Sequence, residues 1–166
     1  MLKQHTQQPA LLIVANRKNQ LSRNSNFGTL NIGRTSNGIR ALADQILHGV
    51  TETQLDYFGG APALDPQTGT LEIDGDPGMG GPVYDAAFDI IGETRLVPLC
   101  SHVEGNGANT KYTIVGFAGV RIVDTNKRGS DKYVNVQPAN VMHDTFVTGD
   151  SGFEKWGAIS APQLTK

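Results

Sequence analysis

The chain has 166 residues, a length that predicts one domain with a sizeable core. Its net charge of −2 and its scattered Lys and Arg residues argue against a nucleic-acid-binding surface. Its one cysteine, Cys100, excludes an intramolecular disulfide and a metal site built from paired cysteines.

The first elements expected along the chain are two strands and a helix. The apolar run at residues 11–15 predicts a buried strand, and residues 27–33 predict a short second strand. Ser36 is the expected N-cap of a helix that Gly49 ends. The apolar face of this helix consists of Ile39, Leu42, Ala43, Ile46, Leu47 and Val50.

Two further helical segments and a short strand are expected between residues 51 and 92. Residues 51–54 predict the cap of one extra helical turn, which the glycines at 59 and 60 close. Residues 70–73 alternate as a strand, and the Asp-Gly and Asp-Pro pairs at 74–77 predict two turns after it. Pro82 predicts the first turn of another helix, which Gly92 ends. Its apolar face consists of Val83, Ala86, Ala87, Ile90 and Ile91.

The most distinctive pattern is a predicted β-hairpin in the second half of the chain. Residues 112–123 and 132–136 are rich in β-branched and aromatic side chains, and the polar residues 124–131 predict the turn between them. Both alternating faces of the first strand are largely apolar, so we expect it to be central and covered on both sides. Gly116 and Gly119 predict a close approach by a neighbouring element. Residues 140–148 are expected to add a last strand.

This order of elements predicts an α+β fold, with a mixed, mainly antiparallel sheet on which two helices pack. Residues 1–148 form the expected domain and residues 149–166 a polar C-terminal tail. No stretch approaches the roughly 20 apolar residues of a membrane span. The polar start and the short apolar run at 10–15 also lack the pattern of an export signal. Membrane association would therefore need a segment outside this sequence.

Two groups of residues raise the question of an active site or a metal site. Ser151 lies in a Gly-Asp-Ser-Gly motif like the nucleophile loop of trypsin-like proteases, but no histidine stands in a base motif, so a loop is the simpler interpretation. Asp65, Asp74 and Asp76 could offer oxygen ligands to a metal ion, yet the spacing of a known calcium loop is missing. Whether they bind a metal stays open at this point.

The remaining chemistry-bearing residues have structural interpretations, and the sequence indicates no cofactor. Cys100 ends an apolar run and is expected to pack as a small hydrophobe, with His102 on the same face of a strand. His48 is expected in the last turn of the first helix, where it complements the helix dipole. The Gly-Asn-Gly run at 105–107 lacks the lysine of a phosphate-binding loop and predicts a hairpin turn.

Several blocks of sequence in one order across residues 26–138 resemble a known family. They include Asn-Phe-Gly-Thr at 26–29, Leu-Asp-Tyr-Phe-Gly-Gly at 55–60 and, most specifically, Tyr-Thr-Ile-Val-Gly-Phe-Ala-Gly-Val-Arg-Ile at 112–122. The chain thereby resembles bacterial TadE/TadG-like proteins of the tight-adherence (Flp) pilus-assembly group. The resemblance implies an extracytoplasmic domain, which in that group normally follows a transmembrane segment, and it supplies no catalytic residues.

Together these observations predict a non-enzymatic protein of the cell surface that acts through protein partners or self-association. One alternative is a self-assembling subunit of a filament or shell. Another is a small secreted hydrolase that uses Ser151 or a spatial cluster of Asp74, Asp76 and His102.

Overall fold

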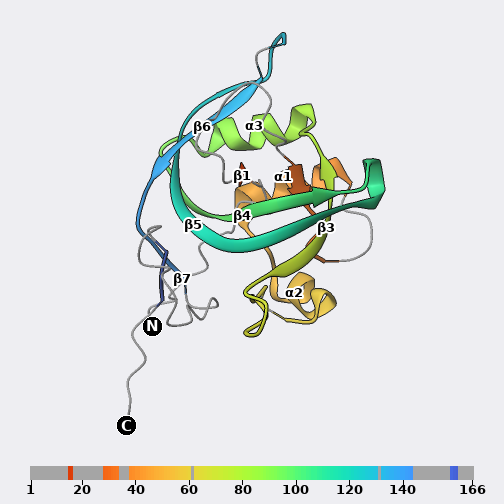
Figure 1. Cartoon of the computed structure of the whole chain (residues 1–166). Helices are drawn as coiled ribbons and strands as arrows, with labels where there is room; N and C mark the ends of the chain where they lie inside the picture. The colour runs from red at the N-terminus through yellow and green to blue at the C-terminus, as the bar shows by residue number, and fades with distance from the viewer. Residues whose placement is uncertain are drawn as a thin grey trace.

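The computed structural model describes residues 15–16, 28–33, 38–60, 62–130, 132–143 and 158–160, and it has the α+β fold that the sequence predicts (Figure 1). Six strands form one sheet in the order β1-β4-β5-β3-β2, with β6 added beside β5. These strands are β1 Ala15–Asn16, β2 Gly28–Leu30, β3 Leu71–Pro77, β4 Thr94–Glu104, β5 Thr110–Asn126 and β6 Tyr133–Pro138. The helices are α1 Ile39–His48, α2 Glu52–Phe58 and α3 Gly81–Asp89. A separate parallel pair consists of β7 Val141–His143 and β8 Ala158–Ser160.

The centre of the sheet is β5, as the sequence predicts. It pairs antiparallel with β4 along most of its length, with β3 at its start and with β6 at its end. The predicted hairpin of β5 and β6 is therefore confirmed. The strand is longer than expected, because residues 124–126 continue the pairing with β6 after a bulge instead of forming the turn. Backbone pairing accommodates these polar residues, and the Tyr133 hydroxyl donates a hydrogen bond to Asp124 Oδ2 over 2.7 Å.

The longest hairpin of the structure joins β4 to β5, and the sequence indicated only its apolar first half. The strand continues through residues 101–104 to the turn at Gly105, which was expected from the Gly-Asn-Gly run. Gly105 has a φ of 83° and Gly107 a φ of 55°, in the left-handed region that favours glycine. The turn continues as a short 3₁₀ helix, Gly107–Asn109, which leads directly into β5.

One face of the sheet, here called the inner face, carries the core. On it Tyr112, Ile114 and Ile122 of β5 are completely buried. Figure 1 shows β4 and β5 as a long curved pair with α3 and α1 on the same side, and α1 and α3 pack against each other. These helices contribute buried side chains to the same core, namely Leu42, Ile46, Val83, Ala86 and Ala87.

The expectation that β5 is covered on both sides is only partly correct. On the opposite face Phe117 is buried, whereas Thr113 and Val115 are half-buried and Val123 is 40% exposed. No described helix packs over this whole face. Near the start of β5, the outer face of the sheet is therefore accessible to solvent and can carry polar side chains.

The helix ends differ from the predicted ones in three details. The N-cap of α1 is Gly38 without a side-chain hydrogen bond, so the prediction of Ser36 as the cap is wrong. Ile39 and Ile91 are 41% and 40% exposed, because one begins α1 and the other lies beyond the end of α3. The end of α1 at Gly49 agrees with the prediction, whereas α3 ends at Asp89 with Ile90 as its C-cap, before the predicted Gly92.

The close approach predicted at Gly116 does not occur, that at Gly119 stays a prediction, and close approaches occur at two other glycines. A Cβ atom added at Gly116 would meet only Leu99 Cδ1, at an ordinary 3.9 Å. At Gly75 it would overlap the backbone carbonyl oxygen of Thr29 and lie 2.8 Å from Cε2 of Tyr112, and at Gly28 it would overlap the hydroxyl of the same ring. The Tyr112 ring thus lies over β3 and β2, and these two glycines leave the space for it.

Several predictions fall on residues outside the described part of the chain. These are residues 11–14 of the expected first strand, Ser36, residues 144–148 of the last strand, and residues 149–157 and 161–166 of the tail. The neighbouring β1, β7 and β8 are described, and β8 lies within the expected tail. Among the described helices, none combines the length and the apolar character needed to cross a membrane.

Candidate functional site

A groove of about 450 Å³ lies between α2 and the outer face of the sheet. We call it the α2 groove. The side chains that give it its chemistry are Asn31, Tyr57, Phe58, Glu72, Asp74 and Lys111. They come from the residues after β2, from α2, from β3 and from the start of β5, so the groove exists only in the folded chain.

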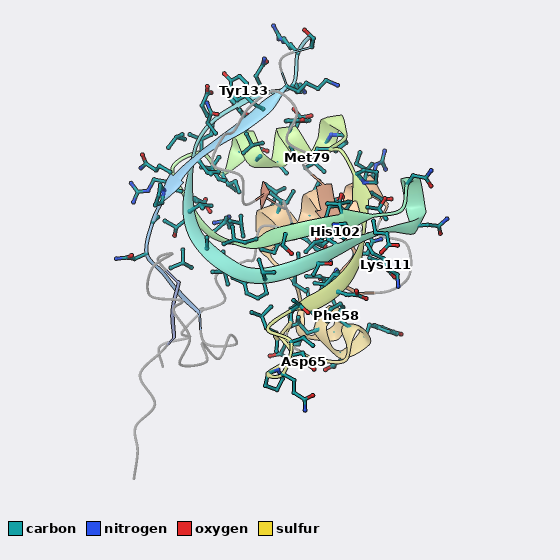
Figure 2. All side chains as sticks on the ribbon, viewed as in Figure 1. Phe58, Asp65, Met79, His102, Lys111 and Tyr133 are labelled. Carbon is teal, nitrogen blue, oxygen red and sulfur yellow. The ribbon has the colours of Figure 1, made fainter. Side chains whose placement is uncertain are left out.

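The strand alternation of β3 places two carboxylates in the groove. Leu71, Ile73 and Gly75 turn to the inner face, so Glu72 and Asp74 turn outward, where both are exposed. The antiparallel register sets Asp74 opposite Lys111 of β5. The cross-strand pairing continues from β5 to β4, where Glu104 lies opposite Lys111 and His102 opposite Thr113. Figure 2 labels Lys111 and His102 on these neighbouring strands.

The aromatic side of the groove depends on how α2 begins and ends. Thr51 Oγ1 accepts a hydrogen bond from the Gln54 backbone N–H over 3.3 Å, and Gln54 Oε1 accepts one from the Thr51 N–H over 2.9 Å. This is the predicted cap, and Gly59 in the left-handed conformation ends the helix as predicted. Phe58 is half-buried against the core, whereas Tyr57 remains 53% exposed at the groove.

The charges of the groove are not neutralised by ion pairs in the described part of the chain. The ion pairs found there are His48–Asp44, Arg95–Glu93 and Lys127–Asp85. None of them includes Glu72, Asp74 or Lys111. The groove therefore presents two carboxylates and one ammonium group to the solvent.

Asn31 adds an unsatisfied acceptor to the wall of the groove. Its Oδ1 is shielded from solvent and has no hydrogen-bond donor among the described residues. A second such acceptor, Gln45 Oε1, belongs to a fully buried side chain whose Nε2 donates to the Ile32 carbonyl over 2.9 Å. Buried acceptors without donors cost stability, so each marks a place where an added donor would be favourable.

The three aspartates considered as metal ligands are not brought together. Asp65 lies in the loop after α2, where its Oδ1 accepts hydrogen bonds from the Thr68 and Gln67 N–H groups, each over 2.8 Å. These bonds lower the pKa of Asp65 below its usual value and close a turn. Asp74 and Asp76 lie on β3. Within the described residues, no three His, Cys, Asp or Glu side chains gather in a way that could hold a metal ion.

The interpretation of residues 74–77 as two turns is wrong. They extend β3, where Asp76 pairs with Thr29 of β2 and Asp74 with Lys111 of β5. A strand with a neighbour on each side satisfies its backbone groups, and this outweighs the local turn preference of Asp-Gly and Asp-Pro.

The residues considered for hydrolysis do not form a cluster either. His102 belongs to β4, and β5 lies between it and the aspartates of β3. Neighbouring strands are about 4.8 Å apart, which separates His102 from β3 by roughly 10 Å. Ser151 lies outside the described residues.

Cys100 and His48 have the structural positions that the sequence predicts. The prediction that His102 shares the face of Cys100 is wrong, because a bulge sets Cys100 opposite Ile114 and His102 opposite Thr113, on opposite faces of the sheet. Cys100 is 2% exposed, its Sγ donates to the His102 carbonyl over 2.9 Å, and burial raises the pKa of the thiol. A raised pKa disfavours the thiolate that a nucleophile needs. His48 lies in the last turn of α1, with Nδ1 3.0 Å from Asp44 Oδ1.

Sequence reasoning missed the groove, although one signal for it was present. The alternation Leu-Glu-Ile-Asp at 71–74 already indicates a strand with a polar outer face. The contribution of Tyr57 and Lys111 to the same surface depends on how α2 and β5 are placed, and no local pattern reports that. No protein-family model, no curated protein and no solved structure matches this chain.

Proposed function

We propose that this chain is a non-enzymatic, extracytoplasmic protein of the TadE/TadG-like pilus-assembly kind, which acts through protein–protein contacts at the α2 groove. The sequence resemblance supports the family and the compartment, and its most specific block, residues 112–122, forms most of the central strand. The observation that carries the contact site is the exposed Tyr57 beside an open groove with charges that have no ion-pair partner in the described chain. Exposed aromatic side chains next to polar groups are typical of protein-binding surfaces.

A self-assembling subunit is the alternative that a specific observation favours. Of the described strands, only β5 pairs with β6, so the outer edge of β6 offers backbone groups to another strand. Such an edge can add a strand from a second copy of the chain. Light scattering on the purified protein separates the two proposals, because a concentration-dependent oligomer favours self-assembly and a strict monomer favours a different partner.

The main proposal can be tested with a photo-crosslinking amino acid at position 57. In cells of the organism that encodes the protein, we expect ultraviolet light to link this position to one envelope protein, which mass spectrometry identifies. The same amino acid at position 88 is the control, because Phe88 is 62% exposed on α3, outside the groove. Crosslinks of equal yield at both positions, or a protein found only in the cytoplasmic fraction, would contradict the proposal.

A further inference from the structure

On the basis of the proposed function, the α2 groove also indicates which chemical group of a partner protein it binds. We infer that the groove binds an arginine side chain of the partner protein. The inference combines the charge of the groove walls, the exposed aromatic ring and the position of Lys111.

The lining of the groove carries an excess of negative charge, because it includes the carboxylates of Glu72 and Asp74 and a single ammonium group, that of Lys111. Glu72 and Asp74 lie two residues apart on one face of β3, which separates them by about 7 Å along the strand. A guanidinium group has five N–H donors in one plane and can donate to both carboxylates.

The aromatic ring distinguishes a guanidinium group from other ligands of a carboxylate pair. Tyr57 is 53% exposed and lines the same groove as Glu72 and Asp74. A planar cation can lie over such a ring while its edge donates to the carboxylates, a geometry that arginine uses more often than lysine.

The position of Lys111 decides which cations the groove can retain. It lies on β5 between Asp74 of β3 and Glu104 of β4, without an ion pair to either among the described residues. Its charge weakens binding of every cation, so only a ligand that also contacts the ring and both carboxylates is retained.

The test is a nuclear magnetic resonance titration of the purified protein with N-acetylarginine amide, with N-acetylcitrulline amide as the neutral ligand of the same shape. We expect saturable shifts of the backbone amides of Tyr57, Glu72, Asp74 and Lys111 with the arginine compound only. The double variant E72Q/D74N should weaken this binding by about tenfold or more, because both charged acceptors are lost. Thermal unfolding of each variant verifies that it is folded.

Two single substitutions make the test specific. E104Q removes a carboxylate from the same face that does not line the groove, and it should change the Kd by less than about twofold. K111M should tighten binding, by about threefold, because it removes the competing cation. Equal binding of the citrulline compound, an E104Q effect as large as that of E72Q/D74N, or stronger shifts with a methyl glycoside than with the arginine compound would overturn the inference.

The crosslinking experiment separates failure of the inference from failure of the proposed function. A partner that is captured at position 57 equally well by the E72Q/D74N protein supports the proposed function and overturns the arginine site. Binding of the arginine compound together with no envelope partner at position 57 supports the site and overturns the proposed function.

Discussion

The two faces of the β3–β5–β4 sheet differ sharply, although the same strands make both. On the inner face Ile73, Tyr112 and Ile114 are at most 2% exposed. On the outer face Glu72, Asp74 and Lys111 are exposed, one residue along the same strands. Because side chains alternate across a strand, one backbone can supply a core on one side and a recognition surface on the other. Substitutions on the two faces should therefore affect different properties.

The largest effect is expected from truncating the inner face. Ile114→Ala removes a completely buried side chain at the centre of the core, and we expect it to lower the free energy of unfolding by about 2–5 kcal/mol. Val115→Ala, at the next and half-buried position, is the matched control and should cost less than about 1 kcal/mol. Chemical denaturation measures both. Similar losses at the two positions would mean that the faces are equally buried.

A smaller loss is expected where a side chain would be added instead of removed. Gly75→Ala places a Cβ atom 2.8 Å from the Tyr112 ring, and we expect a loss of about 1–3 kcal/mol from overpacking. Gly116→Ala meets only an ordinary 3.9 Å contact and should change stability by less than about 1 kcal/mol. If thermal unfolding shows Gly116→Ala to be the more harmful change, the Thr29 carbonyl and the Tyr112 ring do not lie against Gly75 as the structure has them.

A substitution in α2 should weaken binding at the outer face without changing a residue of the sheet. Thr51→Ala removes the side-chain cap of the helix and should cost about 1 kcal/mol in chemical denaturation. Because α2 carries Tyr57, the same variant should also weaken binding of the arginine compound to the groove. Thr53→Ala, in the same exposed first turn but outside the cap, is the control and should leave both measurements nearly unchanged. A Thr51→Ala protein with unaltered stability would contradict the capping role.

An effect of similar size at neutral pH is expected from Tyr112→Phe, which removes one 3.3 Å hydrogen bond to the Asp76 carbonyl, a loss of about 0.5–1.5 kcal/mol. Burial raises the pKa of Tyr112 from 10.0 to about 12. Between these values the unfolded chain loses the proton while the folded one keeps it, so stability falls as pH rises.

The variant should therefore show a shallower loss of stability at alkaline pH than the parent protein. Denaturation curves between pH 8 and pH 11, read against the two pKa values of 10.0 and about 12, measure this slope. Phe88→Leu, at a position 62% exposed, removes no ionisable group, so it is the control and should keep the slope of the parent protein. An identical slope in Tyr112→Phe would contradict the burial of the hydroxyl.

The amino-acid sequence by itself determined the elements whose signals are local. The helical spacing from Leu42 to Leu47, the cap formed by Thr51 and Gln54, and the β-branched alternation around Ile114 all reappear in the structure. Each of these features arises from contacts between residues a few positions apart, or from a periodicity that exposes one side of an element. Such information is complete within a short stretch of sequence.

Only the tertiary structure decided which distant segments meet. Asp74 to Pro77 have local turn signals, but pairing with β2 and β5 makes them a strand, because the backbone groups gain partners on both sides. Tyr57, Asp74 and Lys111 share a groove only because α2 lies against β3 and because the register sets residue 74 opposite residue 111. Register is a relation between segments far apart in the chain, so no single stretch of sequence contains it.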